Sequence, residues 1–146
     1  MTSTHHELRG GCACGIVRYR FLSSKPAGEL QPRACQCIFC KPGNAQYVGD
    51  SAGRLEVEVT DKRYLYSHSF GTYTADFVHC GRCNHLVYVT TIVDGKIYAL
   101  VELHGLEEDL EASDPVPMDF DGESVDERLG RRAGTWIPEL EIQEHA

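Results

Sequence analysis

Long hydrophobic runs are missing from this sequence. None of its 146 residues lies in an apolar stretch approaching the roughly 18 residues that cross a bilayer as a helix. Residues 1–9 are polar and lack the apolar centre of a secretory signal. We therefore expect no membrane partner and a cytoplasmic location, where thiols stay reduced.

Positive charge is also scarce. The chain has 14 lysines and arginines against 22 aspartates and glutamates, which gives a formal net charge of -8. A surface with this balance disfavours nonspecific binding to the phosphate backbone of nucleic acids. We therefore expect no nucleic-acid partner.

Helical periodicity is the third absence, because no window before residue 102 repeats apolar residues every 3.6 positions. Alternating and β-branched runs predict strands instead. The predicted strands cover residues 16–22, 45–48, 54–60, 62–68, 73–79, 86–93 and 96–101. Asp94 and Gly95 separate the last two strands and predict a hairpin turn. The sequence therefore predicts a mainly β protein built from antiparallel sheets.

The length suits one domain over residues 1–146, and no internal repeat is present. We expect the core of this domain to cover about residues 8–103. The remainder, residues 104–146, is predicted to be a C-terminal extension that contains an acidic loop at 114–127.

Three local expectations complete this outline. Residues 1–9 should be a loose lead-in, since chain ends are poorly ordered unless something holds them. Residues 103–110 are compatible with a short helix. Trp136 and Ile137 are the apolar residues that should bring the extension back to the core.

Cysteine is concentrated rather than scattered. All seven cysteines fall into three groups, and none lies elsewhere. The groups are Cys12 and Cys14, then Cys35, Cys37 and Cys40, then Cys80 and Cys83. An odd number of reduced thiols argues against a disulfide framework. The Cys-x-Cys and Cys-x-x-Cys spacings each bring two sulfurs to one point, which is half of a zinc site.

Division of the seven sulfurs into four and three predicts two zinc ions per chain. The two outer pairs, Cys12 with Cys14 and Cys80 with Cys83, would form a closed four-sulfur site of the structural kind. The triplet Cys35, Cys37 and Cys40 would supply three ligands and leave a fourth position open, which is the layout of a catalytic zinc.

Other readings of the cysteines stay open at this point. The thiols would be buried small side chains or redox-labile groups if no metal binds. An iron–sulfur cluster uses overlapping spacings. A different division of ligands would have His79 or His85 complete a site, although a position beside the ligands or on the surface is the simpler role for each.

Three stretches together resemble the glutathione-dependent formaldehyde-activating enzyme family, which also includes centromere-protein-V-like proteins. They are Gly-Cys-Ala-Cys-Gly-Ile-Val-Arg-Tyr at 11–19, Cys-Gln-Cys-Ile-Phe-Cys at 35–40 and Phe-Val-His-Cys-Gly-Arg-Cys at 77–83. The resemblance implies a twisted, tent-like antiparallel β fold of the Mss4-like type, stapled by zinc. It also implies a structural zinc at Cys12, Cys14, Cys80 and Cys83 and a catalytic zinc at Cys35, Cys37 and Cys40.

The resemblance further implies a zinc-dependent carbon–sulfur lyase or synthase. Its partners would be a glutathione-like thiol and a formaldehyde-like aldehyde, and the product S-hydroxymethylglutathione or a related adduct. Tyr47 could donate a hydrogen bond there and Arg33, Lys41 or Arg82 could hold a carboxylate, although packing and solvation are their simpler roles. The alternative is a non-enzymatic zinc module of the same fold that binds a protein partner.

Overall fold

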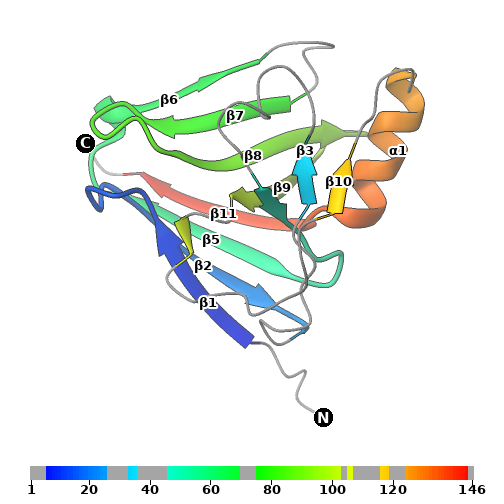
Figure 1. Ribbon diagram of the computed structural model, residues 1–146, viewed down its shortest axis with the longest axis horizontal. Helices are drawn as coiled ribbons and strands as arrows, with labels where there is room; N and C mark the ends of the chain where they lie inside the picture. Colours follow the sequence, from blue (N-terminus) through cyan, green and yellow to red (C-terminus); the bar gives the residue numbers. More distant parts are fainter. Residues whose placement is uncertain are drawn as a thin grey trace.

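The computed structural model describes most of the chain in seven stretches. These are residues 6–25, 33–35, 46–69, 75–102, 105–106, 116–118 and 124–144. Within them the protein is mainly β, as predicted, and its strands form two sheets (Figure 1).

The first sheet has four strands in the order β1-β2-β5-β11. They are β1 (His6–Gly11), β2 (Val17–Ser23), β5 (Arg54–Val59) and β11 (Glu139–Glu144). β1, β2 and β5 are antiparallel neighbours, whereas β11 runs parallel to β5. This sheet lies below the second one in the view of Figure 1.

The second sheet has seven strands in the order β10-β3-β4-β9-β8-β7-β6. The strands are β10 (Val116–Met118), β3 (Arg33–Cys35), β4 (Gln46–Val48), β9 (Lys96–Glu102), β8 (Leu86–Val93), β7 (Ala75–Cys80) and β6 (Leu65–His68). β10 pairs with β3 in parallel, and the other neighbours are antiparallel. The predicted hairpin is present, with Asp94 and Gly95 both at positive φ between β8 and β9.

The main core lies where the two sheets face each other. β2 and β5 alternate buried and less buried residues, as expected for strands with one face on the core. Tyr19 and Phe21 of β2 and Leu55 and Val57 of β5 are at most 3% exposed and join one apolar cluster with Tyr88 of β8. The predicted period-2 pattern of residues 54–60 therefore identifies the inward residues of β5.

The helix α1 (Val125–Thr135) packs against β8 at one end of the molecule (Figure 1). It begins with a capping box, in which Ser124 and Glu127 satisfy each other's backbone N–H groups. Arg132 is buried and donates a hydrogen bond to Thr91 Oγ1 at 3.1 Å. No helix in the described part of the chain has both the length and the apolar character of a membrane span.

Several local expectations need correction. Residues 6–9 are not a loose lead-in, because they belong to β1 and pair with β2. The predicted strand at 62–68 opens with a 3-10 turn at Lys62–Tyr64 before β6. Most of the predicted helix at 103–110 lies outside the described residues, but Leu106 forms an isolated β-bridge with Gly10.

The segment after residue 110 departs from expectation in a different way. Within the predicted acidic loop, Val116–Met118 is a strand and Val125 begins α1. Trp136 and Ile137 are buried, as predicted, at 5% and 0% exposure. The antiparallel prediction fails for β10 and β11, because both join their neighbours in parallel.

Asp50 ties the loop after β4 to the end of β2. Its carboxylate accepts hydrogen bonds from Ser24 N and Ser24 Oγ at 2.7 Å each, from Ala52 N at 2.9 Å and from Ser23 Oγ at 3.2 Å. We expect Asp50→Ala to lower the free energy of unfolding by about 2 kcal/mol, since it removes the charged acceptor of four hydrogen bonds, including the one from the buried Ser23 hydroxyl. The neighbouring substitution Ser51→Ala, at an exposed position, is the matched control in denaturant unfolding.

The effect of Asp50 should also depend on pH. Burial alone raises the pKa of this carboxyl, but the hydrogen bonds from Ser24, Ala52 and Ser23 outweigh burial and hold it below 3.8. A lowered pKa stabilises the fold above the unfolded value, and the stabilisation is lost as the pH falls through the folded value. The two proteins should therefore converge in stability at strongly acidic pH, and a constant difference down to that pH would contradict this role.

Candidate metal centre

The four outer cysteines meet at one point. Cys12 and Cys14 lie in the turn between β1 and β2, Cys80 ends β7, and Cys83 lies in the turn that follows β7. Their four sulfurs all lie within 4.8 Å of one another. The structure therefore brings together two cysteine pairs that lie 66 positions apart in the sequence, counted from Cys14 to Cys80.

The spacing of the sulfurs fits a tetrahedral metal ion. Cys12 Sγ and Cys14 Sγ are 3.6 Å apart, and Cys14 Sγ and Cys80 Sγ are 3.5 Å apart. Four thiolates around zinc at a bond length near 2.3 Å would be about 3.8 Å from one another. The donor set is sulfur alone, which suits zinc or another thiophilic metal. The four cysteines can thus hold one metal ion with little rearrangement.

The first pair is positioned by a glycine-bracketed turn. Gly11 and Gly15 have φ values of 154° and 83°, which side chains rarely adopt. The turn is closed by the Cys12 N–H, which donates to Val17 O at 2.9 Å. The Val17 N–H in turn donates to Cys12 Sγ at 3.3 Å, which fixes the position of this sulfur in the turn.

The second pair lies on a similar turn after β7. The Asn84 N–H donates to Cys80 O at 2.7 Å, and the Cys80 N–H donates to His85 O at 3.0 Å. Asn84 closes the turn with a φ of 59°, and its Oδ1 accepts a 2.7 Å hydrogen bond from the hydroxyl of Tyr66 on β6. Asn84 and Tyr66 are not among the predicted site residues, although asparagine is a frequent choice where φ must be positive.

The thiols of the second pair differ in acidity. Burial raises the pKa of Cys80 to about 12, despite hydrogen bonds from the Cys83 and Arg82 backbone. Burial would also raise the pKa of Cys83, but N–H donors from Cys14 and His85 lower it to about 6. Four adjacent sulfurs cannot all ionise without a compensating cation, because each thiolate disfavours the next. A bound cation would remove that conflict.

The two nearby histidines do not belong to the group of four sulfurs. His79 is buried and stacks on Tyr66, with 5.1 Å between the ring centroids, and its Nδ1 donates to Phe77 O at 3.3 Å. His85 buries its Nε2 with no hydrogen-bond partner among the described residues. Among those residues the sulfur group is therefore complete without a histidine ligand.

The triplet falls mainly outside the described residues. Cys35 ends β3, in register with Met118 of β10, whereas Cys37 and Cys40 lie outside the described stretches. β3 and the second cysteine pair belong to opposite halves of the seven-stranded sheet, since β3 is next to one edge and β7 next to the other. Cys35 and the second cysteine pair are thus held by different parts of the fold.

Two of the residues considered for substrate contacts can be placed. Tyr47 is 6% exposed and packs edge-on against Phe77, with ring centroids 6.5 Å apart, as a strand tyrosine in an apolar cluster does. Arg82 is exposed beside the four sulfurs. Lys41 and the side chain of Arg33 lie outside what the structure describes.

Comparison with known protein families covers the part of the chain that contains the cysteine groups. The sequence matches the profile of the family described as glutathione-dependent formaldehyde-activating enzyme over residues 7–120. The chain belongs to this family. The match to the formaldehyde-activating family spans all seven cysteines, whereas α1 and β11 lie beyond it.

A solved structure shares the fold. A crystal structure of a Rhodobacter sphaeroides protein superimposes with a TM-score of 0.51 at 24% sequence identity. The alignment covers 75% of this chain and 97% of that chain. No curated protein matches the sequence. The formaldehyde-activating family is thus supported by the sequence profile, and the solved structure adds likeness of fold.

Proposed function

We propose that the protein is a zinc-dependent carbon–sulfur lyase or synthase that joins a small thiol to an aldehyde. The thiol would be glutathione or a similar compound, the aldehyde formaldehyde or a similar one, and the product S-hydroxymethylglutathione or a related adduct. The observation that supports the proposal is that the four outer sulfurs lie within 4.8 Å of one another, so that together they can hold one metal ion. The three triplet sulfurs are therefore available for a second site in a chain of this family.

In this proposal each chain holds two zinc ions in one Mss4-like domain of a cytoplasmic protein. Cys12, Cys14, Cys80 and Cys83 would hold the structural ion, and Cys35, Cys37 and Cys40 the catalytic one. A zinc ion with an open coordination position would supply the charge that lowers the pKa of a thiol. The substrate thiol would give up its proton, its sulfur would form a bond to the aldehyde carbon as the C=O π bond opens, and the carbonyl oxygen would take up a proton to become a hydroxyl.

The strand β3 supplies the rigid part of the proposed catalytic site. It is held on one side by β4, at Arg33 and Ala34, and on the other by β10, where Met118 is in register with Cys35. A ligand on a paired strand is positioned more precisely than one on a free loop. The alternative of a non-enzymatic zinc module would instead require a fourth protein ligand at the triplet.

The activity is tested by exchange NMR of glutathione with formaldehyde. The protein should accelerate exchange between free glutathione and its hydroxymethyl adduct, and Cys37→Ser should abolish the acceleration while the protein remains folded. Gln36→Ala, at the neighbouring position, is the matched control and should keep the acceleration. Absence of any acceleration by a protein that holds two zinc ions would reject the enzyme and favour the module.

A further inference from the structure

The four cysteines of the metal centre differ in their access to solvent. Cys80 is fully buried and Cys12 is 3% exposed. Cys83 is half-buried, whereas Cys14 is exposed. Oxidation of cysteine depends on exposure as well as on thiolate character. Cys14 is therefore the member of this group that a reagent in solution reaches first.

Cys14 Sγ is also the less restrained sulfur of the first pair. The Val17 N–H donates to Cys12 Sγ at 3.3 Å and holds that sulfur in the turn. Within the described stretches, Cys14 Sγ accepts no backbone N–H and contacts the sulfurs of Cys12 at 3.6 Å and Cys80 at 3.5 Å. Its side chain can therefore move towards a neighbouring sulfur without breaking a hydrogen bond to the backbone.

Cys80 is the sulfur best placed to form a disulfide with Cys14. The two Sγ atoms are 3.5 Å apart, so an approach of about 1.5 Å brings them to the length of a disulfide. Cys12 Sγ is 3.6 Å from Cys14 Sγ, but Cys12 is bound to Val17 through both its N–H and its sulfur. A bond from Cys14 to Cys80 leaves these contacts of Cys12 intact.

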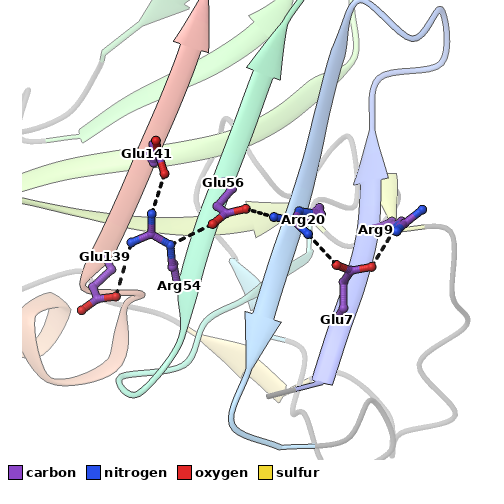
Figure 2. Close-up of polar contacts among 7 residues, drawn as sticks. All are labelled: Glu7, Arg9, Arg20, Arg54, Glu56, Glu139 and Glu141. Atoms are coloured by element: carbon purple, nitrogen blue, oxygen red, sulfur yellow. Dashed lines mark hydrogen bonds and ion pairs between the residues drawn. The ribbon is translucent and has the colours of Figure 1, made fainter. Parts of the chain in front are cut away.

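The strands that carry the two cysteines are held by contacts that need no metal ion. β2 follows the turn of Cys14 and lies between β1 and β5, and β7 ends at Cys80 and lies between β8 and β6. A charge lattice on the outer face of the four-stranded sheet adds ion pairs within and between its strands (Figure 2). The lattice consists of Glu7, Arg9, Arg20, Arg54, Glu56, Glu139 and Glu141. Cys14 and Cys80 should therefore stay close together when a metal leaves.

We propose that Cys14 is an oxidation site for hydrogen peroxide and that Cys80 then closes a disulfide with it, which releases the bound metal. This oxidation site rests on the metal ion proposed for the four outer sulfurs, but it is independent of the reaction proposed at the triplet. One oxygen of the peroxide bonds to Cys14 Sγ as the O–O bond breaks, and hydroxide leaves. Cys80 Sγ then bonds to Cys14 Sγ as the new S–O bond breaks, and a second hydroxide leaves.

Atoms and electrons balance over these two steps. The two thiolates together give up two electrons, which reduce one peroxide to two hydroxide ions, and two protons from solvent convert these to water. Cys12 and Cys83 alone remain as thiolates, and two sulfurs do not complete a zinc site. The metal is therefore released, while the disulfide keeps the same two turns joined across 66 positions of the sequence.

Hydrogen peroxide treatment of the reduced, zinc-loaded full chain tests this site. With dimedone present to trap sulfenic acids, mass spectrometry should find the adduct on Cys14 before any other of the four outer cysteines. Without dimedone, the peptide that contains Cys14 should be joined to the peptide that contains Cys80. A chelating dye should report about one equivalent of zinc from the Cys37→Ser protein, which keeps the four-sulfur ion alone.

Two histidine variants separate the role of Cys14 from that of the site as a whole. Histidine can replace cysteine as a zinc ligand but has no thiol to oxidise. Cys14→His should therefore retain the metal and release it about tenfold or more slowly on peroxide treatment. Cys83→His is the matched control and should release metal at nearly the parent rate, because Cys14 and Cys80 are both present.

The possible outcomes distinguish this oxidation site from the proposed function. A first adduct on Cys12, Cys80 or Cys83, a disulfide of the outer cysteines that omits Cys14 or Cys80, or metal retained after the disulfide forms would each overturn it. A reduced chain that holds no metal at the four sulfurs would instead reject the metal centre of the proposed function. If Cys14→His does not bind zinc, the adduct and disulfide maps of the parent chain still decide.

Discussion

Cys80→Ser should lower the free energy of unfolding by about 5 kcal/mol or more and release one equivalent of metal per chain. Cys80 is fully buried, and its sulfur lies 3.5 Å from that of Cys14. Structural zinc sites contribute on the order of 10 kcal/mol of apparent binding free energy, and that energy is available only to the folded state. Loss of one of four ligands should remove a large part of it.

Metal analysis and thermal unfolding measure this effect. For a chain of this size, 5 kcal/mol corresponds to a fall in the unfolding midpoint of about 10–20 °C. The control is Ala13→Ser, which places a hydroxyl at the exposed position between Cys12 and Cys14 and removes no sulfur. Cys37→Ser should also release one equivalent of metal. It should lower the unfolding free energy much less, because the proposed three-ligand site does not join distant parts of the chain as the four-sulfur site does. A Cys80 variant with full metal content and an unchanged midpoint would contradict a metal at the four sulfurs.

Gly11→Ala is the second substitution with a large expected effect. A methyl group at this position would overlap the carbonyl oxygen of Val17, and the φ of 154° is one that side chains rarely adopt. Neither obstacle can be removed without moving the backbone that positions Cys12. We expect a loss of about 3 kcal/mol in unfolding free energy, from steric strain and backbone conformation together.

Gly130→Ala is the matched glycine control. Gly130 lies within α1, and a methyl group there meets nothing within 4 Å. Alanine favours the helix over glycine, so this variant should gain about 0.5–1 kcal/mol. The two variants should therefore move the denaturant midpoint in opposite directions. A Gly11 variant as stable as the parent protein would show that the turn can relax.

Local sequence signals predicted most of the β structure. β5 buries alternate residues, β8 is rich in β-branched residues, and the Asp94-Gly95 turn has the residues that positive φ requires, so each can be recognised from its own sequence. The four sulfurs were predicted for a similar reason, since metal-type spacings are local even when the two pairs are distant.

Other features depend on contacts that no local pattern encodes. β1 is a strand because it pairs with β2, although its residues are polar and contain two glycines at its end. In Glu139–Glu144 the apolar residues Leu140 and Ile142 alternate with polar ones, but the strand is mostly exposed, and its parallel pairing with β5 cannot be inferred from that pattern. The charge lattice likewise follows from register between four strands, which composition does not reveal. The capping-box residues Ser124 and Glu127 are visible in the sequence, although the acidic composition of residues 114–127 predicts a loop there.

The parallel pairing of β5 with β11 has a consequence for biosynthesis. Arg54–Val59 must wait for Glu139–Glu144 to leave the ribosome, so the four-stranded sheet cannot be completed during most of translation. The cysteine pairs at 12–14 and 80–83 emerge long before that. A metal ion captured at that stage would fix the nascent chain while its last strand is still being synthesised.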